Sequence, residues 1–411
     1  MDRQVKYDCV KILKESGNPV IIVAAVHESE AILNACKEKG IQVAGFCDSI
    51  KEKSQKKFCG LEVIHTPSLP DRFSKARFII ASQHIQDCLE QLTGLGYDEF
   101  YSPLQLLEDY NLSKYDYLIS KSYMEARLAV CKNSHKMYFQ NKEKIYMRSI
   151  DIMITERCSL KCESCCNLMQ YYKEPKNTDK ISILDSLKII SDNVDEISEF
   201  RIIGGEPLMN RGWSVIVKNI AERYPGRQIF IYTNGTIAPK DDKLESLKNK
   251  NVNFVITDYG HLSRNIKSLE SQLDKFNLNY VSTPAEHWVD CSSIRHHKRS
   301  TSDLKEVFKQ CCVKYIYTLL NGKLYRCPFI ANAANLNAIP DNPANYVDLF
   351  SKSLNIKDQI KRLVKVAKFF PGCDFCDGRP YDGTNSKGYD GKGMIKAGIQ
   401  TPTILDYKEY K

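Results

Sequence analysis

The chain has 411 residues, a formal net charge of +9 and a hydrophobic fraction of 43%, enough apolar material for two or three packed domains. It contains no run of 18 apolar residues and begins without an apolar segment, so we expect neither a membrane span nor a signal peptide. Sixteen cysteines in a chain without an export signal predict a reducing, cytoplasmic location and thiols that bind metal or fill cores. The basic residues are scattered among acidic ones, which argues against a nucleic-acid partner and weakly favours an anionic substrate.

Residues 1–110 alternate strand-like and helical patterns, which predicts a doubly wound α/β domain with a parallel sheet. The turn after the first predicted strand, residues 24–29, contains no glycine, so it lacks the cradle that a dinucleotide pyrophosphate needs. Asp48 nevertheless stands where a ribose-binding acid would lie, and His27 is a candidate ligand contact. The pattern resembles the Rossmann-like accessory domains of some sugar C-methyltransferases and other sugar-modifying proteins, and we expect no NAD here.

A helical linker is expected over residues 111–148, followed by a second α/β region over 149–285. In parallel α/β folds, active-site groups follow the carboxyl ends of the strands. The chemistry-bearing residues of this region do follow predicted strands, which are 150–154, 200–203, 228–232, 252–256 and 279–281. The pattern places no sixth strand.

Three cysteines with C-x3-C-x2-C spacing follow the first of these strands: Cys158, Cys162 and Cys165. The second strand ends in a turn formed by Gly204, Gly205, Glu206 and Pro207. Three thiolates can hold three irons of a 4Fe–4S cluster and leave the fourth iron open, whereas most clusters have four cysteines. A structural zinc site is the simpler alternative for the cysteine spacing alone.

The cysteine loop followed by the Gly-Gly-Glu-Pro turn resembles the radical S-adenosylmethionine (radical SAM) enzymes. The resemblance implies a partial (β/α)6 barrel whose open iron binds the amine and carboxylate of S-adenosyl-L-methionine (AdoMet), with the turn receiving the amine. An electron from a flavodoxin- or ferredoxin-type reductant would then yield a 5′-deoxyadenosyl radical that abstracts hydrogen from an unactivated C–H bond. Thr233 and Asn234 follow the third strand and are expected to contact AdoMet or substrate, although Asn-Gly is also an ordinary tight turn.

A second group of cysteines lies in the C-terminal region, residues 286–411. Cys312 and Cys327 flank a predicted hairpin whose Asn-Gly turn ends at Gly322, so the hairpin brings the two thiols together. Cys373 and Cys376 supply a C-x2-C loop and complete four thiolates, a set that zinc would accept as readily as iron.

The C-x9-G-x4-C hairpin followed by C-x2-C resembles the twitch module, the smaller relative of the SPASM module of radical SAM enzymes. The resemblance implies one auxiliary 4Fe–4S cluster with full cysteine ligation. Cys311 is an alternative to Cys312, but the spacing to Gly322 favours Cys312. The glycine-rich tail, residues 378–398, is expected to be an extended wrap near this second cluster.

A fully ligated cluster has no open iron, so we expect it to accept an electron from a substrate radical and leave a ketone. Epimerisation is the alternative outcome, and it needs a hydrogen donor such as Cys291 or Cys166. Arg295 and His287, in the basic segment between the two cysteine regions, are the candidate catalytic bases. A solvated basic loop is the other interpretation of that segment.

The sequence therefore predicts a radical SAM oxidoreductase that dehydrogenates or epimerises a sugar, aminosugar or nucleotide-sugar. The first alternative is a radical SAM maturase of a ribosomal peptide. The second is a non-catalytic protein with two structural zinc sites.

Overall fold

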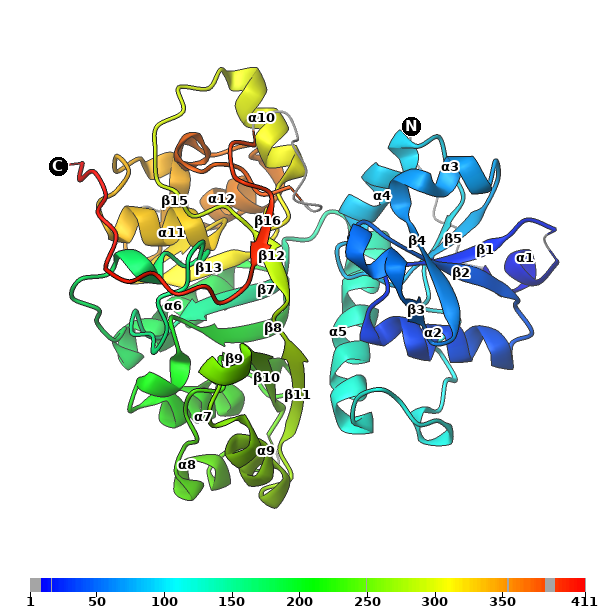
Figure 1. Ribbon diagram of the computed structural model, residues 1–411, viewed down its shortest axis with the longest axis horizontal. Coiled ribbons are helices and arrows are strands. Elements are labelled where there is room, and N and C mark those ends of the chain that lie inside the picture. The colour runs from blue at the N-terminus through cyan, green and yellow to red at the C-terminus, as the bar shows by residue number, and fades with distance from the viewer. Residues whose placement is uncertain (1–8, 16, 249, 353–354, 381–388, 411) are drawn as a thin grey trace. The chain divides into compact units, whose positions relative to one another are not determined.

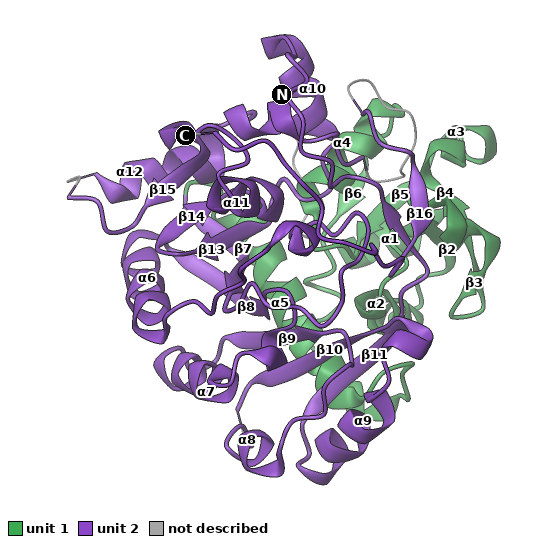
Figure 2. Ribbon diagram, turned by 60° about the vertical axis from the view of Figure 1, so that its left-hand side comes forward, with its two compact units in different colours: residues 1–143 green, residues 144–411 purple. Residues whose placement is uncertain are grey.

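The computed structural model describes residues 9–15, 17–248, 250–352, 355–380 and 389–410. The chain forms two compact units, residues 1–143 and 144–411 (Figure 2). Helix α5, Lys121–Gln140, lies in the stretch that the sequence suggested as a linker and belongs to the first unit. Among the described residues, no helix is both long and apolar enough to cross a membrane.

A six-stranded sheet with the order β3-β4-β2-β1-β5-β6 forms the centre of the first unit. All its pairings are parallel except β3 with β4. Its strands are β1 Val20–Val23, β2 Val43–Asp48, β3 Lys57–Phe58, β4 Leu61–His65, β5 Arg77–Ile80 and β6 Phe100–Tyr101. The remaining helices of this unit are α1 Cys9–Glu15, α2 His27–Glu38, α3 Leu69–Arg72 and α4 Ile85–Gly94.

Both faces of this sheet are covered, because successive side chains of a strand point to opposite faces. Ile22 packs in one buried cluster with residues of α2 and α5, while Ile21 and Val23 pack in another with residues of α3 and α4. The Asp48 carboxylate accepts hydrogen bonds from the Ala25 and Ile50 N–H groups and pairs with Lys53 at 2.8 Å. Two backbone N–H groups and Lys53 therefore already bond to the carboxylate that the sequence indicated as a possible ribose ligand.

The second unit is built on an eight-stranded sheet with the order β11-β10-β9-β8-β7-β13-β14-β15 (Figure 1). The strands from β7 to β11 pair in parallel, as the alternating pattern predicted. These strands are β7 Tyr146–Met153, β8 Glu196–Ile203, β9 Gln228–Thr233, β10 Val252–Asp258 and β11 Asn279–Pro284. The connecting helices are α6 Lys180–Asn193, α7 Trp213–Arg223, α8 Asp241–Glu245 and α9 Ile266–Lys275.

The predicted hairpin is present and extends this same sheet. Strand β13, Tyr317–Leu320, pairs in parallel with β7 and in antiparallel with β14, Lys323–Tyr325. The turn residues Asn321 and Gly322 have φ of 48° and 75°, the left-handed values that a two-residue hairpin of this kind requires. The other C-terminal elements are β12 His287–Val289, β15 Tyr346–Asp348, β16 Met394–Lys396, α10 Thr301–Gln310, α11 Pro328–Asn335 and α12 Ile356–Lys361.

Candidate active site

The cysteine loop follows β7 and folds tightly on itself. The Cys165 N–H donates to the Cys162 carbonyl at 3.3 Å, and Ser164 between them has a φ of 55°. Burial raises the pKa of the Cys165 thiol well above its ordinary range, and the neighbouring Cys166, Cys158 and Cys162 thiols raise it further. The three predicted ligands therefore lie close enough to act on one another electrostatically.

Gly204 and Gly205 are glycines because the cysteine loop lies directly against them. A Cβ on Gly204 would lie 2.3 Å from the Thr155 carbonyl oxygen, and one on Gly205 would lie 2.6 Å from the Cys158 Cβ. The Gly205 N–H donates to the Thr155 carbonyl at 3.0 Å. The chain after β8 thus packs directly against the chain after β7, next to Cys158. A residue larger than glycine does not fit at positions 204 and 205.

Glu206 is fully buried and ties the end of β8 to the end of β9. Its carboxylate accepts hydrogen bonds from the Asn234 N–H at 2.7 Å, the Thr233 hydroxyl at 2.9 Å and the Leu208 N–H at 3.1 Å. Burial raises the pKa of Glu206 to about 7, against these hydrogen bonds, which lower it. Pro207 begins the short 3-10 turn that follows Glu206. The bonds from Glu206 to Thr233 and Asn234 bring together the six residues predicted to bind AdoMet, which are Gly204, Gly205, Glu206, Pro207, Thr233 and Asn234.

N–H groups are directed at two of the three sulfur atoms. The Cys158 sulfur accepts from the Leu160 N–H at 3.5 Å and from the Asn234 amide at 3.8 Å. The Cys162 sulfur accepts from the Gln400 amide at 3.2 Å. Hydrogen bonds of this kind stabilise thiolate ligands and raise the reduction potential of a cluster.

The donor set fits an iron–sulfur cluster, because soft thiolates with N–H donors around them are its usual ligands. Within the described ranges, no three His, Cys, Asp or Glu side chains converge on a point that could hold a single metal ion. Tyr259 follows β10 and lies near the cysteine loop. Burial is the main cause that raises the pKa of the Tyr259 hydroxyl, and the four cysteines of the loop raise it further.

Cys311 influences the other thiols of the second group more than Cys312 does. After burial, the groups that raise the pKa of Cys327 most are Cys373 and Cys311, and those that raise the pKa of Cys376 most are Cys291, Cys311 and Cys327. We therefore propose Cys311 as the fourth ligand, in place of Cys312, which the spacing to the hairpin glycine favoured.

Cys312 belongs to a different cluster of side chains, around the buried guanidinium of Arg379. The Cys312 N–H donates to the Arg379 carbonyl at 2.9 Å. Burial lowers the pKa of Arg379, but the Cys291, Cys166 and Cys312 thiols outweigh it and hold that pKa above its ordinary range. Cys166, which the sequence analysis named as a candidate hydrogen donor, thus faces a cation.

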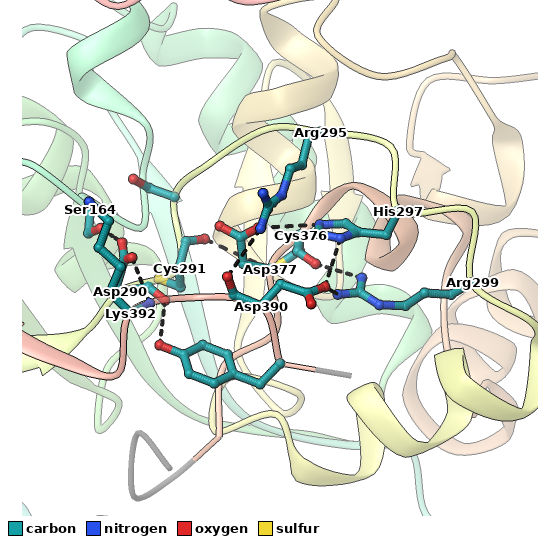
Figure 3. Close-up of polar contacts among 12 residues, drawn as sticks. Ser164, Asp290, Cys291, Arg295, His297, Arg299, Cys376, Asp377, Asp390 and Lys392 are labelled. Carbon is teal, nitrogen blue, oxygen red and sulfur yellow. Dashed lines mark hydrogen bonds and ion pairs between the residues drawn. The ribbon is translucent and has the colours of Figure 1, made fainter. Parts of the chain in front are cut away.

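The basic segment after β12 binds the C-x2-C loop (Figure 3). Arg295 pairs with the buried Asp377 at 3.0 Å, and Arg299 donates to the carbonyls of Cys373 and Cys376 at 3.1 and 2.7 Å. These basic side chains therefore hold the loop, and neither of the two interpretations made from the sequence foresaw that role. His287, the other predicted base, lies exposed on β12 opposite Lys396.

Residues 152–268 match the Radical SAM superfamily. The chain contains a radical SAM domain. Such a domain indicates an enzyme, and its family implies a 4Fe–4S cluster and AdoMet. The matched range includes the three cysteines, the Gly-Gly-Glu-Pro turn, Thr233 and Asn234.

A GTP 3′,8-cyclase from Clostridium acetobutylicum is 33% identical over 150 residues, which are 33% of this chain and 46% of the cyclase. The match thus spans less than half the length of that relative. The solved structure of BtrN in complex with AdoMet and 2-DOIA covers 60% of this chain and 98% of its own, with 17% identity and a TM-score of 0.37. Streptococcus suis SuiB bound to S-adenosylmethionine covers 43% and 42%, with 15% identity and a TM-score of 0.30. Scores this low support no transfer of function.

Glu206→Gln is expected to destabilise the radical SAM domain by about 1–3 kcal/mol, because its new amide N–H₂ would face backbone N–H donors and leave one unsatisfied. Urea unfolding measures the loss, and calorimetry should show weaker AdoMet binding. Glu174→Gln, at an exposed position of the same unit, is the matched control and should change neither. Equal stability and AdoMet affinity in the two variants would contradict the role given to Glu206.

Sequence reasoning missed Ser164, Asp290 and Gln400, which contact the cysteine loop or its surroundings. The Ser164 hydroxyl donates to the Asp290 carboxylate, whose other oxygen accepts the Lys392 N–H at 3.0 Å (Figure 3). None of these contacts is local in sequence, so no motif could have indicated them.

Proposed function

We propose that the protein is a radical SAM oxidoreductase with an auxiliary 4Fe–4S cluster that dehydrogenates or epimerises a carbinol carbon of a sugar, aminosugar or nucleotide-sugar. The observation that supports this proposal is that Cys311, Cys327, Cys373 and Cys376 lie within electrostatic reach of one another, in the same compact unit as the radical SAM domain. Four thiols leave a cluster without an open iron, which suits it to electron transfer rather than substrate chelation.

In this proposal Cys158, Cys162 and Cys165 hold the catalytic cluster, and the Gly-Gly-Glu-Pro turn receives the amine of AdoMet. When bound, the cluster and AdoMet supply a 5′-deoxyadenosyl radical at the carboxyl ends of the parallel strands. Thr233 and Asn234 keep Glu206 in place, and the Asn234 amide also contacts the Ser159 hydroxyl at 3.0 Å. These residues fix the edge of the sheet against which the cofactor would bind.

Dehydrogenation of a carbinol to a ketone removes two protons and two electrons from the substrate. Removal of one hydrogen atom from the carbinol carbon leaves a substrate radical that must lose one proton and one electron to become a ketone. An auxiliary cluster held by Cys311, Cys327, Cys373 and Cys376 would accept that electron, and a base would take the proton. Of the two proposed bases we favour His287, because the Arg295 guanidinium is already paired with Asp377.

The sugar assignment is supported by two features. The first is the doubly covered parallel sheet of residues 1–143, whose sequence pattern resembles that of accessory domains in sugar-modifying proteins. The second is a single four-cysteine group, the layout suited to two-electron oxidation of an alcohol. The physiological reductant is proposed to be a flavodoxin or ferredoxin.

The test starts with iron, sulfide and zinc analysis of anaerobically purified protein, where about eight irons are expected for two 4Fe–4S clusters. The protein is then reduced with dithionite and incubated with AdoMet and sugars deuterated at each carbinol carbon. Deuterium should enter 5′-deoxyadenosine, and mass spectrometry of the sugar separates a ketone from an epimer. Zinc without iron would overturn the radical SAM assignment. Absence of deuterium transfer from every sugar, with 5′-deoxyadenosine still formed, would overturn the sugar and leave a peptide substrate to be tested.

A further inference from the structure

The C-terminal segment 397–401 runs antiparallel to the catalytic cysteine loop, although about 240 residues separate the two in sequence. The Glu163 N–H donates to the Ile399 carbonyl at 2.6 Å, and the Thr401 N–H donates to the Lys161 carbonyl at 2.7 Å. These two bonds flank an isolated bridge between Cys162 and Gln400. The central cysteine of the loop is therefore paired, backbone to backbone, with the tail.

The Gln400 side chain adds a direct contact to the Cys162 sulfur. Its amide oxygen accepts the Lys161 N–H at 2.7 Å, and its amide nitrogen donates to the Gly398 carbonyl at 2.8 Å. These two partners settle which end of the amide is oxygen, because an N–H needs an acceptor and a carbonyl needs a donor. The nitrogen that also lies 3.2 Å from the Cys162 sulfur is therefore a donor.

The approach of the tail to this position is sterically specified. Gly398 has a φ of 79°, and a Cβ there would lie 2.6 Å from the Tyr259 ring. Upstream, β16 pairs with β12 in antiparallel, and Trp288 of β12 packs edge-on against Tyr259 with ring centroids 5.9 Å apart. The tail passes over Tyr259 only because residue 398 has no side chain.

A second contact holds the same loop through Ser164, which donates to Asp290 (Figure 3). Residues 389–393 contact Asp290 through both backbone and side chain: the Lys392 N–H donates to its carboxylate at 3.0 Å, and the Tyr389 hydroxyl donates to its carbonyl at 3.0 Å. The Asp390 N–H donates in turn to the carbonyl of Asp377, next to Cys376, at 2.7 Å. Residues 389–393 thus bond both to Asp290, which holds the catalytic cysteine loop through Ser164, and to Asp377, which follows Cys376.

We propose that residues 389–401, here called the strap, hold the catalytic cysteine loop in place and that Gln400 is a positioning residue whose amide stabilises the Cys162 thiolate and raises the potential of the catalytic cluster. The part concerning the potential rests on the proposed function, whereas the part concerning the loop does not. An N–H···S bond stabilises the reduced state of a cluster more than the oxidised state, since the reduced state carries more negative charge.

The test compares Gln400→Met, which keeps length but cannot donate, with Gln400→Glu, which places a negative charge against the sulfur. Gln400 is itself exposed, so neither change leaves a cavity in the core. Thr403→Ala, three residues further along the tail at an exposed position, is the matched control. Hydrogen–deuterium exchange of peptides covering 158–166 and 397–403 reports the loop, and an EPR-monitored redox titration reports the cluster.

Gln400→Met removes all three side-chain hydrogen bonds of Gln400. It should speed exchange in both peptides by at least about fivefold, the effect of losing one ordinary hydrogen bond, while Thr403→Ala should not. The potential of the catalytic cluster should fall in Gln400→Met and fall further in Gln400→Glu. Unchanged exchange in Gln400→Met would overturn the strap. Faster exchange with an unchanged potential would overturn the role of the amide at Cys162. Absence of any cluster signal in the wild type would instead count against the proposed function, and exchange would still decide the strap.

Discussion

Replacing Cys158, Cys162 and Cys165 together by alanine is expected to abolish 5′-deoxyadenosine formation and to lower the iron content from about eight to about four per chain. The three thiols lie within electrostatic reach of one another and beside the turn that contains Glu206, and their loss removes every proposed ligand of the catalytic cluster. The second group of four thiols should keep its iron. Iron and sulfide analysis, with chromatography of the AdoMet reaction, measures both effects.

Cys166→Ala is the control for this experiment, because Cys166 belongs to the same loop but faces Arg379. It should retain about eight irons, the content of two clusters. Loss of all iron in the triple variant would mean that the second group holds no iron. The dehydrogenation mechanism would then lose its electron acceptor.

Cys311→Ala should lose the auxiliary cluster, whereas Cys312→Ala should retain it. The two positions are adjacent, so the pair is matched for local sequence and for effects on the chain around them. Cys311 is near Cys373, and both act on Cys327, whereas the groups that act most on Cys312 are Arg379, Cys311 and Cys166. Iron content should fall from about eight to about four in Cys311→Ala only.

The same pair of variants separates oxidation from hydrogen abstraction. Cys311→Ala should still form 5′-deoxyadenosine, because its catalytic loop is unchanged, but it should form no ketone. If Cys312→Ala loses four irons and Cys311→Ala does not, the assignment made from sequence spacing is correct and the one made from the structure is wrong.

Much of the second unit was predictable from the sequence, because its signals are local. Five apolar runs became the parallel strands β7 to β11, since short apolar runs separated by helical patterns favour that topology. The cysteine spacing and the Gly-Gly-Glu-Pro turn indicated the radical SAM domain, since both depend on residues close together along the chain. The hairpin turn at Asn321 and Gly322 was equally local.

The first unit shows where local patterns fail. The sequence pattern indicated no strand over residues 61–65, yet β4 forms there, pairs in parallel with β2 and carries the edge strand β3. From the sequence, the Asp48 carboxylate was a candidate to bind a ribose, but in the structure it bonds to Lys53 and to two backbone N–H groups. A residue's type indicates what it can bind, whereas its neighbours in space decide whether it is free to do so.

The sequence by itself determined which residue types the candidate site offers: three thiols, a glycine turn and an acid that follow neighbouring strands. Only the tertiary structure gives a reason to prefer Cys311 over Cys312 for the second group, because residue spacing does not fix the direction in which a side chain points. Only the tertiary structure brought Gln400 to Cys162, since their contact depends on the path of a tail about 240 residues away. Local turns follow from covalent geometry, but long-range pairs form only when the packing of the whole unit brings their backbones together.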